Sequence, residues 1–256
     1  MLLVAASVYF AAAGVHIYWP RGVLTMIALA VAFGWLAATM PGEPQMSHPS
    51  IPRLARTASI VGGLLWACLP PVFVYTSPGL DKPATARYAL AVTSMWLVGV
   101  VSLLLLLLGL SQLRWIGRDR LGRLGEAGLL ASAIALGTMA LGNGIELYTV
   151  TTRGTESEVG HTIFLIAFLV LMVASVLVGQ AFVRRRWSVG VRWAGLLLLL
   201  ALPLGVLLLI VGGALSPDTD LGFWSALTVP YALARVLLAV FASQGAMPSM
   251  PVGTPG

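Results

Sequence analysis

The chain has 256 residues, of which 59% are hydrophobic and only 9% are charged, with a mean hydropathy of +0.94 and a formal net charge of +6. Soluble domains carry about 25% charged residues, so this composition excludes a soluble globular domain. The basic residues lie in short gaps between apolar runs, so the positive charge does not indicate a nucleic-acid partner. We predict an all-α protein, a polytopic bundle of transmembrane helices.

The apolar runs predict about eight transmembrane helices, because a helix needs roughly 20 apolar residues to cross the bilayer. The predicted spans are about 2–18, 23–40, 57–76, 87–110, 125–149, 158–183, 193–215 and 223–243. The first segment lacks a basic n-region and an obvious cleavage site, so we interpret it as a retained helix. Residues 1–243 then form a single transmembrane domain, and the uncharged, proline-containing tail 244–256 is predicted to be disordered.

Arginines collect in alternate gaps between these spans. Ten of the 15 basic residues fall in the gaps 41–56, 111–124 and 184–192, four fall in the other gaps, and Arg235 lies inside the eighth span. The positive-inside rule places the richer side in the cytoplasm, and an even number of spans places both termini there. We therefore expect a multi-pass protein of a cell membrane, of the bacterial inner or plasma membrane type, with the lipid bilayer as its partner.

One face of the fifth predicted span is lined by small and polar residues. By the 3.6-residue period this stripe contains Gly128, Ser132, Ala135, Met139, Gly142, Asn143 and Glu146. Small residues let a neighbouring helix approach closely, so the stripe is predicted to face the bundle. Its outer end is polar, because Asn143 and Glu146 are neighbours there.

The sixth predicted span returns after a short gap and carries a histidine in its second turn. Thr155 followed by Glu158 fits a capping box, which predicts a helix start near residue 156. An antiparallel hairpin of the two spans would bring Glu146 and His161 to a similar depth, and His16 ends the first span on the same side. A carboxylate beside an imidazole can orient the ring and relay a proton.

These residues define a candidate site for an ion or another ligand, made of Glu146, Asn143, His161 and His16. It has three interpretations: a proton or ion site, a metal or haem site with His16 and His161 as ligands, or interfacial residues that only stabilise the bundle. The chain has no His-x-x-His or Cys-x-x-Cys pattern, and its one cysteine lies in an apolar run. We therefore predict no metal and no cofactor.

Arg235 is the basic residue that breaks the loop pattern. It lies about eight residues from the cytoplasmic end of the eighth span, or about 12 Å along a helix. Glu126, in the first turn of the fifth span, starts from the same side and could complete an ion pair. Pro230 predicts a kink nearby, and a kink beside a buried arginine also suits a cavity for an anionic group. Both interpretations stay open, so Arg235 and Glu126 join the binding candidates.

The pattern of Gly142-Asn143 with Glu146, a glycine-containing external loop and His161 at the start of the next helix resembles uncharacterised bacterial multi-pass membrane proteins. The arginine-, alanine- and leucine-rich, nearly lysine-free composition is similar to that of high-GC, actinobacterial-type proteins of this kind. The resemblance covers the last four predicted spans. It implies a membrane location but no reaction, ligand or catalytic residue.

Two functional hypotheses follow from these residues. The first is a small transporter or permease-like protein for an ion, a proton or a small solute, which predicts a water-accessible route from the outer face. The second is a non-catalytic accessory or assembly subunit of a membrane complex, joined to a membrane-protein partner or a second copy through the small-residue faces of the fifth and sixth spans. An intramembrane enzyme needs a ligand set that the sequence barely offers.

Overall fold

The computed structural model is a bundle of helices. It describes residues 51–69, 85–94, 99–117, 120–184, 187–215 and 221–242. Within these ranges the chain is helical apart from short turns, which agrees with the predicted all-α class. The predicted spans 2–18 and 23–40, the candidate His16 and the tail 244–256 lie outside the described residues.

The helices follow the order of the predicted apolar runs. They are α3 (Ile51–Ala67), α5 (Ala86–Ser94), α6 (Ser102–Gly117), α7 (Gly122–Arg153), α8 (Glu158–Val183), α9 (Val189–Leu199), α10 (Ala201–Leu215) and α11 (Leu221–Ala242). Helix α8 covers the same residues as the predicted sixth span, and α7 exceeds the predicted fifth span by about one turn at each end.

Two helices reach into segments that were predicted to be loops. Helix α3 begins at Ile51, inside the predicted loop 41–56. Pro52 is compatible with this start because it lies in the first turn, where backbone N–H groups have no acceptor within the helix. Helix α6 continues to Gly117, seven residues beyond the predicted end of the fourth span. Its buried Gln112 donates a hydrogen bond from Nε2 to the carbonyl of Ala239 of α11 at 3.3 Å. This bond accommodates in the bundle a polar side chain that lies in the predicted gap 111–124.

The predicted seventh span is broken in the structure. Helices α9 and α10 meet at Leu200 with a bend of 57°. Pro203 lies in the first turn of α10 and has no N–H group for the carbonyl of Leu199, so the helical ladder is interrupted at the bend.

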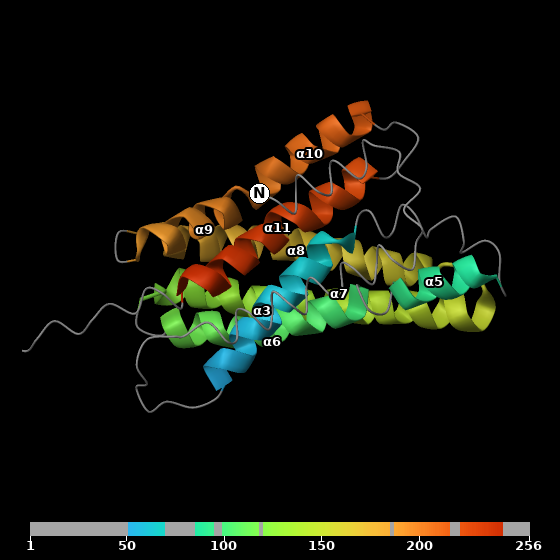
Figure 1. Cartoon of the computed structure of the whole chain (residues 1–256), viewed down its shortest axis with the longest axis horizontal. Helices are drawn as coiled ribbons and strands as arrows, with labels where there is room; N and C mark the ends of the chain where they lie inside the picture. The colour runs from blue at the N-terminus through green and yellow to red at the C-terminus, as the bar shows by residue number, and fades with distance from the viewer. Residues whose placement is uncertain are drawn as a thin grey trace, which may run out of the picture.

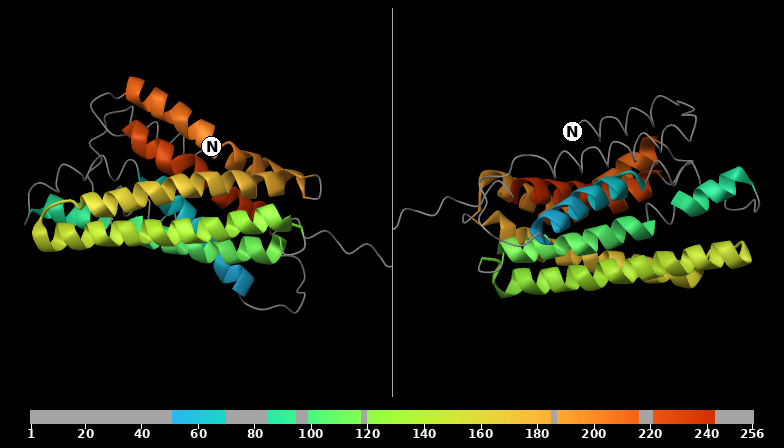
Figure 2. Two further views of the ribbon diagram at one scale, coloured as in Figure 1. Left: turned by 180° about the vertical axis from the view of Figure 1, so that it is seen from behind. Right: turned by 60° about the horizontal axis from the view of Figure 1, so that its bottom comes forward.

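The two longest helices, α7 and α8, form an antiparallel hairpin that runs along the long axis of the molecule (Figures 1 and 2). Helix α3 crosses between α6 and α11, and its adjacent glycines make this possible. A Cβ atom on Gly62 would lie 2.8 Å from Leu105 Cβ of α6, and one on Gly63 would lie 3.1 Å from the carbonyl oxygen of Ala232 of α11. Small residues thus bring the helix backbones close together, as is typical of membrane bundles.

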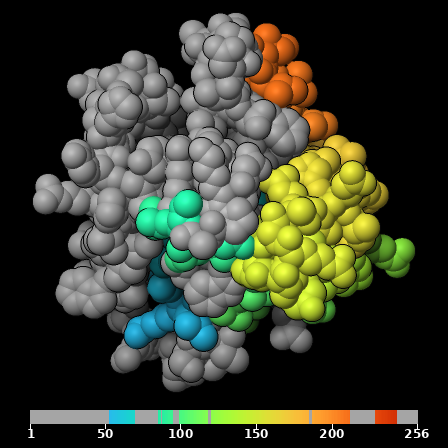
Figure 3. All heavy atoms as spheres, turned by 90° about the vertical axis from the view of Figure 1, so that its right-hand side faces the viewer, coloured from blue at the N-terminus to red at the C-terminus, as the bar shows by residue number. Residues whose placement is uncertain are grey.

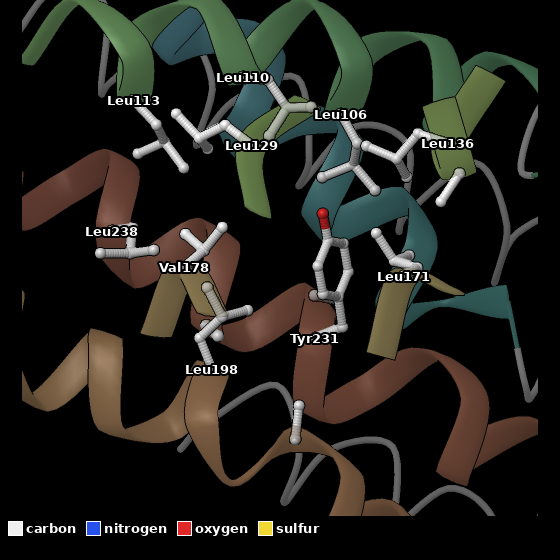
Figure 4. Packing of buried hydrophobic residues seen from close by; sticks show 14 of the residues in the cluster. Leu106, Leu110, Leu113, Leu129, Leu136, Leu171, Val178, Leu198, Tyr231 and Leu238 are labelled. Carbon is white, nitrogen blue, oxygen red and sulfur yellow. The ribbon is translucent and has the colours of Figure 1, made fainter. Parts of the chain in front are cut away.

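Most of the buried apolar side chains form one cluster that several helices share. Leu106 of α6, Leu136 of α7, Leu171 of α8 and Tyr231 of α11 meet in its centre, and all four are 2% exposed or less (Figure 4). In a bilayer, lipid tails are as apolar as these side chains, so close van der Waals packing holds the helices together.

Large apolar side chains also cover the outer faces of α7, α8 and α10. Leu130, Ile134, Ile166, Val173 and Ile210 are each about 60% exposed or more. Proteins in water rarely expose contiguous apolar surface of this extent, so these faces suit contact with lipid.

Three segments of the described chain are long and apolar enough to cross a membrane. They are Tyr88–Gly117, Gly122–Arg153 and Glu158–Val183, and α9 with α10 adds a fourth if the bent pair counts as one span. Helix α7 has 32 residues and is about 48 Å long, which exceeds the roughly 30 Å hydrocarbon layer. A helix of this length is sufficient to reach the polar zones on both sides of a bilayer.

Candidate functional site

Glu146 lies at the end of α7 where the hairpin turns toward α8. The residue is 8% exposed, because the backbone of α8 passes directly over it. A Cβ atom on Gly160 would lie 3.0 Å from the backbone nitrogen of Glu146, and one on Gly142 would lie 2.8 Å from the carbonyl oxygen of Gly160. These two glycines bring the helices together one turn below the carboxylate.

His161 stands beside this carboxylate on α8. Its Nδ1 atom is 3.9 Å from Glu146 Oε1, and the two side chains are 42% and 11% exposed, respectively. This distance is too long for a hydrogen bond, so the contact is an ion pair only when the imidazole is protonated. The structure therefore brings together two residues that the sequence predicted to lie at similar depth.

The start of α8, which positions His161, is organised differently from the predicted capping box. Ser157, in an extended conformation, is the N-cap residue, and its side chain accepts a hydrogen bond from the Gly160 N–H at 3.1 Å. The predicted pair of Thr155 and Glu158 is therefore wrong. Gly154 ends α7 in a left-handed conformation with φ of 70°, and α8 begins at Glu158, two residues later than the box predicts.

Asn143 lies one turn before Glu146 but faces another helix. A Cβ atom on Gly99, just before α6, would lie 2.7 Å from Asn143 Nδ2. Asn143 therefore packs toward α6 while Glu146 is covered by α8. The other members of the predicted stripe are buried, namely Gly128, Ser132, Ala135, Met139 and Gly142. The stripe faces the bundle, and its small residues contact α8 of the same chain.

The end of the molecule near Glu146 carries the connection between α7 and α8. Figure 3 looks onto this end, where the connection between α7 and α8 stands at the surface. Glu156 and Glu158 are exposed in and next to this connection. A half-exposed imidazole backed by a buried carboxylate can pass a proton between the outside and the bundle interior.

Arg235 lies in the interior of the bundle, on α11, and is 1% exposed. Its Nη2 atom donates hydrogen bonds to Ser59 Oγ of α3 at 3.2 Å and to the carbonyl oxygen of Leu106 of α6 at 3.1 Å. The predicted pairing with Glu126 is wrong. Glu126 instead lies 3.7 Å from Arg114 Nε, on the surface at the start of α7, because α6 and not α11 ends beside it.

Three further buried polar groups around the α3, α6 and α11 crossing were not predicted. Trp66 Nε1, Gln112 Oε1 and Tyr231 Oη are buried without a hydrogen-bond partner among the described residues, as is Nε of the predicted Arg235. Some signals for them exist in the sequence. Tyr231 stands four residues before Arg235, so it shares a helix face with the arginine inside the apolar span. Ser59 stands four residues before Gly63, so it shares a face with a glycine that permits close helix packing.

Basic side chains gather at the opposite end from Glu146. Arg120 stacks on Trp187 with its guanidinium carbon 5.4 Å from the ring centroid, which joins the start of α7 to the start of α9. Arg192 Nε donates to the carbonyl of Val183, which joins α9 to the end of α8. Arg53, at the start of α3, is exposed.

Neither a metal centre nor a relative identifies the site. No group of three or more histidine, cysteine, aspartate or glutamate side chains that could hold a metal ion occurs within the described part of the chain. Comparison of the chain with protein-family models, with curated proteins and with solved structures gives no match. The function must therefore be inferred from the residues themselves.

Proposed function

We propose that this protein is a multi-pass membrane protein of about eight spans that moves a proton, or a small ion or solute coupled to one, across a bacterial inner or plasma membrane. Three or four apolar segments and the lipid-facing surfaces of α7, α8 and α10 support the membrane location. The proposed count also includes the predicted spans 2–18 and 23–40.

The proposed orientation places both termini in the cytoplasm. It is supported by the basic end of the bundle, since arginines favour the cytoplasmic side of a membrane. Trp115 and Trp193 are more than half exposed next to Arg114 and Arg192, as expected for aromatic residues at a membrane interface. In this orientation Glu146 and His161 lie near the outer face.

The observation that carries the transport proposal is the contact between Glu146 and His161. An ionisable side chain inside a membrane helix is costly in free energy. A buried carboxylate where two helices contact each other therefore favours a functional role over a purely structural one. His161 is half exposed and within 3.9 Å of that carboxylate, so it offers a route for a proton from the outside. Glu146 then acts as the proton acceptor inside the bundle.

The alternative of an accessory subunit receives less support. It expects the small-residue faces of the fifth and sixth spans to form an open groove for a partner. In the structure Gly128 contacts α8, and Gly142 and Gly160 contact each other across the same hairpin. These faces are used within the chain, so a partner would need another surface.

The test is proton flux into liposomes that contain the purified protein, driven by an imposed pH gradient and read with an internal pH-sensitive dye. Glu146→Gln keeps the shape of the side chain and removes the ionisable group, so flux is expected to fall to the level of empty liposomes. The control is Glu126→Gln, which changes a surface carboxylate at the other end and should leave flux unchanged. Flux in Glu146→Gln equal to that of the unmodified protein would overturn the proposal.

A further inference from the structure

Arg235 is a buried positive charge without a carboxylate beside it in the described structure. Burying a lone guanidinium is expensive, so a counter-charge is expected nearby. The acidic residues that the structure describes are all used or placed elsewhere. Glu126 lies beside Arg114, Glu146 lies beside His161, and Glu156 and Glu158 are exposed at the far end of α7 and α8.

Two hydrogen-bond donors one turn apart on α11 are buried without an acceptor among the described residues. Arg235 uses Nη2 for Ser59 and Leu106, but its Nε–H group is buried and has no partner among the described residues. The hydroxyl of Tyr231, one turn earlier on the same face of α11, is also buried without a partner there. Figure 4 shows this hydroxyl directed toward Leu106, the residue whose carbonyl accepts from Arg235.

We propose that Arg235 and Tyr231 bind a small monovalent inorganic anion of the halide class inside the bundle. The anion accepts hydrogen bonds from Arg235 Nε–H and the Tyr231 hydroxyl, and its single negative charge neutralises the guanidinium. A halide suits the site because it is small and only accepts hydrogen bonds, and both side chains are 2% exposed or less. This site is separate from Glu146, and binding there does not depend on transport.

The experiment measures thermal unfolding of the purified full chain in detergent as sodium gluconate is replaced by sodium chloride or bromide at constant ionic strength. Tryptophan fluorescence reports unfolding, because the chain has eight tryptophans. We expect a saturable rise of the melting temperature with halide, since a ligand that binds only the folded state stabilises it. Unfolding curves that do not differ between gluconate and halide would overturn the proposal.

The informative variant is Tyr231→Phe, which removes only the hydroxyl. Without halide it should melt at the same temperature or higher, because an unpaired buried hydroxyl stabilises nothing. With halide it should bind about fivefold more weakly, the value of one ordinary hydrogen bond. Halide affinity equal to that of the unmodified protein would remove Tyr231 from the site and overturn the proposal.

Two further variants separate this site from others. Arg235→Gln should lose the halide response, and if it does not fold, the Tyr231→Phe result decides by itself. A halide response of full size in folded Arg235→Gln would show that the anion acts elsewhere and would overturn the proposal. Glu146→Gln should keep the response, so loss of proton flux and loss of anion binding are distinguished.

Discussion

Glu146 and Arg235 are both ionisable side chains in apolar helices, but the bundle surrounds them in opposite ways. Glu146 lies near the end of the α7–α8 hairpin and shares its place with a half-exposed imidazole. Arg235 is sealed at the crossing of three helices, where a hydroxyl and a backbone carbonyl accept from it. The first group can exchange with its surroundings, whereas the second cannot do so without movement of the helices.

In the membrane location that we propose, this difference follows from depth. Near a membrane interface, a charged side chain keeps part of its hydration, so a loose partner at 3.9 Å is sufficient. In the interior there is little water, so each N–H group must find a protein acceptor or a ligand. The position of a polar residue along its helix therefore determines whether its neighbours are solvent or backbone.

The largest effect is expected from a substitution that disrupts the contact between α7 and α8 beside Glu146. Gly142→Ala places a Cβ atom 2.8 Å from the carbonyl oxygen of Gly160, so the α7 and α8 backbones must separate. We expect a loss of about 2–3 kcal/mol in unfolding free energy, as for overpacked cores, measured by denaturant titration in detergent.

A matched control exists two residues away on the same helix. A Cβ atom on Gly144 would meet nothing within 4 Å, so Gly144→Ala should be neutral or slightly stabilising. Equal destabilisation by both substitutions would show that the helix approach at Gly142 is not the cause.

The next effect removes an acceptor from Arg235. Ser59→Ala keeps the Cβ atom that packs against Gly109 but leaves one guanidinium N–H without its hydroxyl. We expect a loss of about 1 kcal/mol, read from the same titration. Ser111→Ala is the control, since that exposed hydroxyl bonds only to Leu108 of its own helix, and its loss should have no measurable effect. A neutral Ser59→Ala would mean that the arginine does not need this bond.

The smallest effect concerns the coupling between Glu146 and His161. A double-mutant cycle with Glu146→Gln and His161→Gln should give an interaction of less than about 1 kcal/mol, because the histidine is half exposed. The same cycle on Arg114 and Glu126, a more exposed pair, should give a value near zero. A coupling well above about 1 kcal/mol would contradict a half-exposed contact at 3.9 Å.

The sequence predicted the hairpin of α7 and α8 well because both helices are long, uninterrupted apolar runs joined by a short polar gap. It also indicated which face of α7 is buried, since small residues recur there at helical spacing. The sequence-based predictions were wrong where a contact with another helix outweighs the local pattern of polar and apolar residues. Gln112 was assigned to a loop but is held inside by Ala239, and Glu126 was matched to Arg235 by depth although α6 brings Arg114 to it.

The sequence by itself determined the all-α class of the protein, the helical hairpin and the unusual position of Arg235. These depend on composition and on the 3.6-residue period, which are local properties. Only the tertiary structure decided which groups meet: Ser59 and Leu106 at Arg235, Ser157 at the start of α8, and the glycines that cover Glu146. The reason is that lateral packing of helices depends on how closely their backbones can approach, and residues far apart in the chain set that distance together.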